Sequence, residues 1–80
     1  MRAINQIARD IANDWNTIGK GVNPYAKPYL EALLEIESIE ENYYLDSADS
    51  VVRYFLANAS TYRGTKAKEY KAELKAKLKY

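Results

Sequence analysis

Apolar side chains recur at intervals of three and four residues in four short segments of this 80-residue chain. Such spacing places them on one face of an α-helix, and each helix must then bury that face against another element. β-Branched residues are few, and no run of four or more residues alternates between apolar and polar, so we expect no strand. The pattern predicts an all-α fold, in which residues 1–80 form a single small bundle of three to four short helices.

The boundaries of the first two helices follow from the apolar spacing and from the residues that interrupt it. The first helix is expected over about residues 2–16, before a segment that contains two glycines and a proline. The second is expected to start at Pro24 or Pro28 and to run to about residue 38. A helix of that length would place Glu37 on its buried face, so either the helix ends sooner or a cation meets the carboxylate there.

Capping residues mark the other two helices. Asp46 and Ser47 are expected to open the third, because a short side-chain oxygen can accept hydrogen bonds from the first free N–H groups. Ser60 is expected to cap the last helix, which runs to Leu78. The apolar faces predict one core, formed by Ile7, Ile11, Trp15, Leu30, Leu33, Leu34, Val51, Phe55, Leu74 and Leu78.

Charge is distributed along the chain in three blocks that nearly cancel and leave a net charge of +1. Residues 1–27 carry four basic and two acidic side chains, residues 28–52 seven acidic and no basic ones, and residues 53–80 eight basic and two acidic ones. The acidic block predicts a surface that contacts a basic groove on a partner. Its candidate contact residues are Glu31, Glu35, Glu40 and Glu41. The alternative is that these carboxylates only solvate a helix face and a loop.

The last predicted helix carries a row of lysines on one flank, beside its apolar seam. Such a row can follow a phosphate backbone or meet an acidic partner, but it can also lay its methylenes over the seam and keep its ammonium groups in water. The candidate contact residues are Arg63, Lys68, Lys71, Lys75 and Lys79. If the acidic block and the lysine row lie side by side, they neutralise each other; on separate faces, both stay available for binding.

Eight tyrosines are many for a chain of this length. The tyrosine side chain combines an apolar ring with a polar tip, which suits a surface that is wet alone and buried in a complex, including a homodimer. Three are expected to be exposed in loops or at helix edges: Tyr25, Tyr43 and Tyr44. Three others are expected near the core with their hydroxyls toward the surface: Tyr54, Tyr62 and Tyr70.

The chain has neither cysteine nor histidine, which removes the usual ligands of zinc and the imidazole that activates nucleophiles. Carboxylate pairs act as acid and base only in a cleft that holds them at a fixed separation, and four short helices offer little cleft. We therefore expect a non-enzymatic protein without a cofactor or metal. The first twenty residues contain no apolar run typical of a signal peptide or membrane span, and the absence of cysteine fits a reducing compartment, so a cytoplasmic location is expected.

Five strings from Pro28 onward are more specific than a generic helix requires. They are Pro28-Tyr29-Leu30-Glu31-Ala32-Leu33, Asp46-Ser47-Ala48, Val52-Arg53-Tyr54-Phe55-Leu56-Ala57-Asn58-Ala59, Tyr62-Arg63-Gly64 and Lys71-Ala72-Glu73-Leu74, with Ala67 between the last two. Together they resemble a family of small helical proteins of unassigned role, carried by bacteriophages, prophages and conjugative elements, mostly of Gram-positive bacteria. The chain has Tyr62 where the family's aromatic-Arg-Gly motif has tryptophan, a departure that keeps the aromatic ring.

The resemblance implies a setting, the bacterial host cell, and two functional hypotheses. Phage proteins of this size often act by stoichiometric binding, and many inhibitors of CRISPR effectors are compact domains of similar length, so the first hypothesis is an antagonist that binds a host defence nuclease, as a protein or nucleoprotein complex. The alternative is a small nucleic-acid-binding module whose lysine row holds phosphates. Arg53 and Arg63 belong to the matched strings; either could hold a carboxylate or phosphate on a partner, or pair internally with Glu37.

Overall fold

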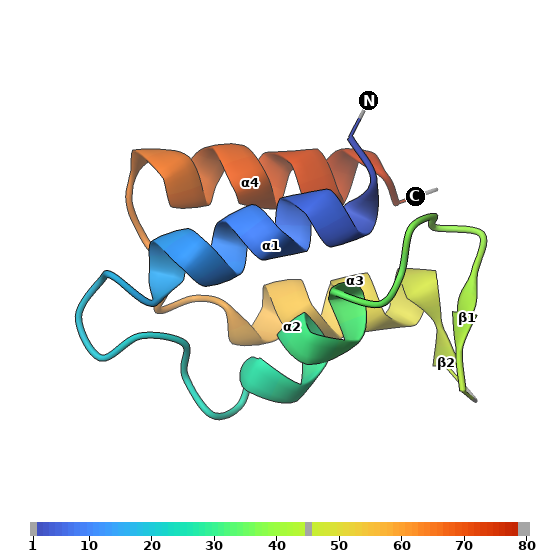
Figure 1. Ribbon diagram of the computed structural model, residues 1–80, viewed down its shortest axis with the longest axis horizontal. Coiled ribbons are helices and arrows are strands. Elements are labelled where there is room, and N and C mark those ends of the chain that lie inside the picture. The colour runs from blue at the N-terminus through green and yellow to red at the C-terminus, as the bar shows by residue number, and fades with distance from the viewer. Residues whose placement is uncertain (1, 45, 79–80) are drawn as a thin grey trace.

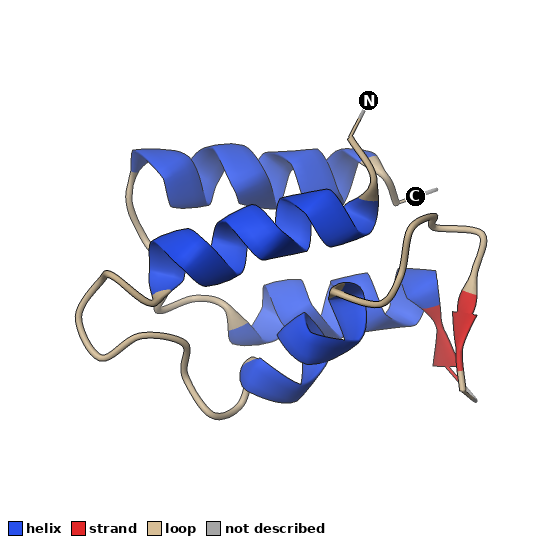
Figure 2. Ribbon diagram, viewed as in Figure 1, coloured by secondary structure: helices blue, strands red, loops and turns tan. Residues whose placement is uncertain are grey.

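Four helices and one short hairpin make up the part of the chain that the computed structural model describes, residues 2–44 and 46–78. The elements are α1 (Ile4–Trp15), α2 (Lys27–Leu33), β1 (Asn42–Tyr43), β2 (Asp46–Ser47), α3 (Ala48–Asn58) and α4 (Thr65–Ala76) (Figure 1). The expected helical bundle is confirmed. The hairpin was not expected, because its antiparallel strands are each two residues long and leave no alternating pattern in the sequence (Figure 2).

The four helices pack in a ring. Helix α1 contacts α4 and α2, and α3 contacts α2 and α4, so α2 and α4 lie across the diagonal of the bundle. In Figure 1, α1 and α4 run side by side above α2 and α3, and the hairpin projects from one end. The molecule measures 32 × 24 × 19 Å.

The core is centred on Trp15, the last residue of α1. Its ring stacks on Tyr62 with centroids 4.7 Å apart and meets the edge of Phe55 at 6.2 Å. Offset-stacked and edge-to-face arrangements are the favourable geometries for aromatic pairs. Of the predicted core residues, Leu34 and Leu78 are half-buried, and the others are buried as expected.

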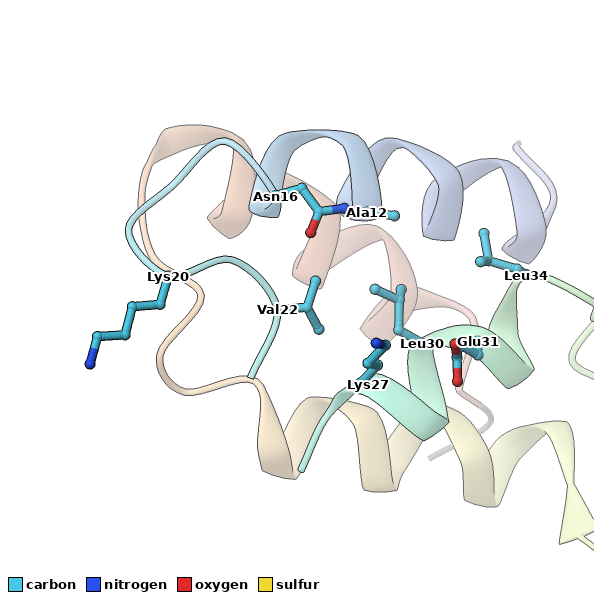
Figure 3. Close-up of a pocket in the computed structure, with 8 residues that line it drawn as sticks. All are labelled: Ala12, Asn16, Lys20, Val22, Lys27, Leu30, Glu31 and Leu34. Carbon is cyan, nitrogen blue, oxygen red and sulfur yellow. The ribbon is translucent and has the colours of Figure 1, made fainter. Parts of the chain in front are cut away.

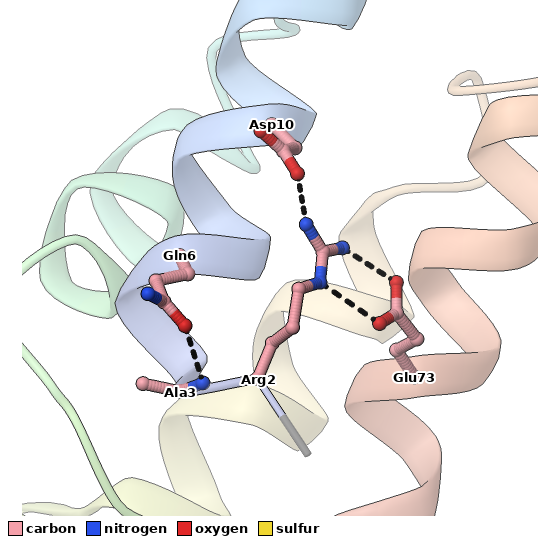
Figure 4. Close-up of polar contacts among 5 residues, drawn as sticks. All are labelled: Arg2, Ala3, Gln6, Asp10 and Glu73. Atoms are coloured by element: carbon pink, nitrogen blue, oxygen red, sulfur yellow. Dashed lines mark hydrogen bonds and ion pairs between the residues drawn. The ribbon is translucent and has the colours of Figure 1, made fainter.

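A charged network fastens the start of α1 to α4 (Figure 4). The Nε and Nη2 atoms of Arg2 donate to the two carboxylate oxygens of Glu73 at 3.1 and 2.6 Å, and Nη1 donates to Asp10. The guanidinium also lies 5.5 Å from the ring centroid of Tyr70. The hydrogen bonds to Glu73, and then to Asp10, raise the pKa of Arg2 further above its already high value. One flank of α4 is thereby held against α1.

Helix α2 ends earlier than expected, at Leu33 instead of about residue 38. The backbone N–H of Ile36 donates to the carbonyl of Leu33, a tighter turn that buries the Ile36 side chain and leaves Glu37 exposed. A carboxylate without a partner is costly to bury, so the chain turns out of the helix where continuing it would bury Glu37. The N–H of Ile4 then donates to the Glu37 carbonyl at 3.0 Å, which joins this loop to α1.

Of the two predicted helix caps, the one at Ser47 is confirmed and the one at Ser60 is wrong. Ser47 caps α3, because its Oγ accepts a hydrogen bond from the Ser50 N–H at 3.1 Å, whereas Asp46 lies in β2 before the cap. Ser60 does not cap α4, which begins at Thr65 after Gly64. The segment between Ser60 and Thr65 is non-helical, and within it Tyr62 turns inward and is fully buried.

Candidate functional site

The lysine row borders a groove between α3 and α4. Leu56 of α3 and Ala72 of α4 form its apolar part, Lys68, Lys71 and Lys75 of α4 form its rim, and its volume is about 330 Å³. Lys68 and Lys75 are exposed, as is Arg63 in the segment before α4. We call this feature, with Arg63, the basic groove. Lys79, the fourth lysine of the predicted row, lies outside the described residues.

Lys71 lies deeper than its neighbours. It is half-buried, its Nζ donates to the backbone carbonyl of Tyr62 at 2.5 Å, and the same atom lies 5.6 Å from the centroid of the Tyr62 ring. Loss of hydration lowers the pKa of Lys71, and the nearby positive charge of Arg63 lowers it further. Lys71 therefore lines the groove with its ammonium group held by the Tyr62 carbonyl.

The acidic block is divided between a helix and a loop. Glu31 is exposed on α2 and Glu35 in the turn that follows it, and the Tyr43 hydroxyl of the hairpin donates to Glu35 at 3.1 Å. This bond chiefly raises the pKa of Tyr43, with a smaller contribution from the charge of Glu31. Asp46 pairs with Tyr43 across the hairpin, so these two side chains share a face. We define the acidic hairpin surface as Glu31, Glu35, Tyr43, Tyr44 and Asp46.

The other predicted acidic contacts belong to the loop before the hairpin. The Glu41 carboxylate accepts hydrogen bonds from the backbone N–H groups of Glu37 and Ser38, at 3.2 and 3.0 Å, so it holds the loop in shape. Glu40 is exposed in the same loop. Asp49 pairs with Arg53 one turn along α3 at 2.6 Å, an internal partner other than the Glu37 that the sequence offered as one alternative. Arg63 donates from Nε to the carbonyl of Ser60 at 3.3 Å.

The predicted exposed tyrosines do not form one cluster. Tyr44 is 85% exposed at the tip of the hairpin, where its ring meets Tyr43 edge-on with centroids 4.7 Å apart. Tyr43 itself is half-buried. Tyr25 is 77% exposed but precedes α2, at the opposite end of that helix from the hairpin. Only the pair at the hairpin adjoins carboxylates of the acidic block.

The three tyrosines expected near the core differ in how deeply they are buried. Tyr62 is fully buried, and its hydroxyl donates to Asp14 at 2.7 Å. Tyr70 is half-buried beside Arg2. Tyr54 is 51% exposed, so its predicted core position is wrong; its ring packs on Tyr29 of α2 at 5.6 Å instead.

Sequence reasoning missed a second groove, which lies between α1 and α2 (Figure 3). Its volume is about 250 Å³, and it is lined by Ala12, Asn16, Lys20, Val22, Lys27, Leu30, Glu31 and Leu34. In Figure 3, Val22 and Leu30 point into the space, whereas Lys20 extends away from it. No periodic signal could have found this groove, because the irregular segment between the two helices supplies Lys20 and Val22.

The two charged surfaces lie on different parts of the molecule. The acidic hairpin surface is formed by α2, the turn after it and the hairpin. The basic groove is formed by α3, α4 and the segment between them, and α2 and α4 are diagonal in the ring. At 100° per residue, Glu69 and Glu73 of α4 project roughly 100–160° away from Lys68, Lys71 and Lys75, and Glu73 is bound to Arg2. The surfaces therefore do not neutralise each other.

Comparison with known proteins gives no significant match to a family model, a curated protein or a solved structure. None of the helices in the described part of the chain has the length and apolar character that a membrane span requires.

Proposed function

We propose that the protein is a non-enzymatic binding protein of a phage or other mobile element, and that it inhibits a host defence nuclease by docking the acidic hairpin surface into that enzyme's nucleic-acid groove. One observation carries the proposal: the exposed ring of Tyr44 at the hairpin tip packs on Tyr43, whose hydroxyl donates to Glu35, on a surface away from the basic groove.

The chemistry of such a groove is complementary to this surface. A nuclease lines the path of its substrate with lysine and arginine, and clustered carboxylates offer the negative charge that these side chains otherwise find in phosphates. Such complementarity accelerates encounter and selects the partner. Affinity also needs buried area, which the ring of Tyr44 supplies. The bond from Tyr43 to Glu35 orders the surface before binding, so less conformational entropy is lost in the complex.

The direct test is complex formation with purified host nucleases, CRISPR effectors first. Size-exclusion chromatography and calorimetry should show a stoichiometric complex with the enzyme free of its DNA target. Preloading the enzyme with that DNA should prevent the complex, since both ligands occupy one groove. Absence of a complex across a broad panel of defence nucleases would contradict the proposal, and so would undiminished binding to the preloaded enzymes.

Two variants and a matched control locate the contact. Tyr44→Ala, and the double variant Glu31→Gln with Glu35→Gln, should each weaken the complex by about tenfold or more, which corresponds to a loss of at least about 1.4 kcal/mol. Tyr25→Ala removes an equally exposed ring from the other end of α2 and should leave affinity unchanged. If Tyr25→Ala weakens the complex as much as Tyr44→Ala, the contact surface is assigned wrongly.

A further inference from the structure

The basic groove concentrates positive charge on one flank of α4. Within the described residues, no carboxylate lies within ion-pair distance of Lys68, Lys71 or Lys75. Arg63 lies close enough to lower the pKa of Lys71 through its charge. Like charges held together at a partly dehydrated position repel each other, and an anion from outside relieves that repulsion. The groove therefore favours a negatively charged ligand.

The spacing of the lysines fits a polymer with regularly repeated charges. Lys68, Lys71 and Lys75 occupy one flank of α4 at intervals of three and four residues, so they extend over roughly 10 Å at the 1.5 Å rise of an α-helix. One strand of DNA presents a phosphate about every 3.4 Å along its axis, so about three phosphates fit beside this flank.

The apolar part of the groove is too small to favour an acidic helix instead. A partner helix laid in a groove is held by several apolar anchors at helical spacing. Here the apolar lining consists of Leu56 and Ala72, and only Leu56 is large. Charge is therefore the main feature that the groove offers a ligand.

We propose that the basic groove binds the phosphate backbone of nucleic acid, with Lys68, Lys71, Lys75 and Arg63 as the contact residues. The site is separate from the acidic hairpin surface and does not depend on the function proposed for it. Binding is driven by release of counterions and carries no sequence preference, because the groove offers side-chain charges and no array of donors aimed at base edges. Affinity should be in the range of non-specific binding, roughly 10⁻⁴ to 10⁻⁶ M at physiological salt.

The test is fluorescence anisotropy of labelled oligonucleotides, a short DNA duplex and a single strand, titrated with the full-length protein at salt concentrations between about 50 and 200 mM. With three to four phosphates neutralised, log K should fall against log salt with a slope of about −3 for the duplex and about −2 to −3 for the single strand. Binding that is independent of salt would overturn the proposal. Competition with a polyglutamate peptide is a second test. If the peptide displaces labelled DNA at a lower concentration of negative charges than unlabelled DNA requires, the groove prefers carboxylates and the proposal is overturned.

The variants are chosen to keep the fold. Lys68→Gln with Lys75→Gln removes two exposed cations and should reduce the duplex slope by roughly two. Lys71 is left in place because it binds the Tyr62 carbonyl and packs on that ring. The control, Lys20→Gln with Lys27→Gln, makes the same change in net charge at two exposed lysines, one in the segment before α2 and one at the first residue of that helix. An equal loss of slope in both variants would mean that net charge, and not the groove, drives binding, which would overturn the proposal; thermal unfolding verifies that both variants are folded.

Discussion

The Tyr62 hydroxyl is a polar group enclosed by the core, and the variant Tyr62→Phe measures what it contributes to stability. Tyr62 is fully buried and donates to Asp14 at 2.7 Å, and phenylalanine keeps the ring that stacks on Trp15. A hydrogen bond to a charged group contributes about 1.5–3 kcal/mol to stability. Asp14 is half-buried, so water can replace the lost donor, and we expect a loss near 1.5 kcal/mol. In a domain of this size, that loss lowers Tm by roughly 6–12 °C.

Urea and thermal unfolding, followed by far-UV circular dichroism, measure this loss. The same substitution in an Asp14→Ala background should cost much less, because the acceptor is already absent. A change in the free energy of unfolding below about 0.5 kcal/mol for Tyr62→Phe would refute the reasoning. So would an equal loss in both backgrounds, since the hydroxyl would then act through something other than Asp14.

The same variant also tests how the stability of the protein depends on alkaline pH. Burial, and then the hydrogen bond to Asp14, raise the pKa of Tyr62 above the usual tyrosine value of 10.0. The neutral hydroxyl therefore contributes stability that is complete below pH 10.0 and is lost as the pH rises above that value. The difference in unfolding free energy between the native chain and Tyr62→Phe should stay constant up to about pH 9 and shrink as the pH rises from about 10 to about 11. A constant difference over that range would contradict the assignment.

Three further substitutions and one control test the local structure by the same unfolding measurements. Gly64→Ala should destabilise the chain by about 1–3 kcal/mol, because φ is +125° at this position. An added Cβ would meet no atom within 4 Å, so the loss comes from backbone strain and not from a clash. An unchanged stability would mean that the turn before α4 has a different conformation. Ser47→Ala should cost about 1 kcal/mol by removing the cap of α3, whereas Ser60→Ala, which caps no helix, should cost less. Glu73→Gln should cost under about 1 kcal/mol and the loss should diminish at high salt, since the pair with Arg2 is over a third exposed; a loss that is independent of salt would contradict this.

The sequence predicted the parts of the fold that local spacing determines. The apolar stripe from Ile7 to Trp15 and the cap at Ser47 each depend on residues within about two helical turns of one another, and both are confirmed. For the end of α2, the sequence offered two alternatives, an early end or a cation beside Glu37, but not the residue at which the helix ends. That residue depends on the cost of burying Glu37 against α1, which a local pattern does not reveal. The start of α4 was misplaced for a related reason: the partner of Tyr62 is Trp15, and the pairing of distant residues is invisible to a local pattern.

The candidate surfaces were predictable as residue lists but not as surfaces. The lysine row was found because its members share one flank of a helix. Leu56 could not be assigned to it, because α3 and α4 meet only in three dimensions. Likewise, the sequence joined Glu31, Glu35 and Glu41 as one acidic block. In the fold, Glu35 accepts from the Tyr43 hydroxyl, Glu41 accepts from two backbone N–H groups, and Glu31 lines the groove between α1 and α2.

The ring of helices makes the basic groove depend on the docking of α4. Helix α4 is joined to α3 by a short irregular segment and is fastened to α1 through Glu73 and Arg2. A ligand that touches both Leu56 and the lysines binds only while α4 is docked, so occupancy would suppress local opening of this helix by mass action. Slower amide exchange along α4, and slower protease cleavage between α3 and α4, would then report an occupied groove without any label on the ligand.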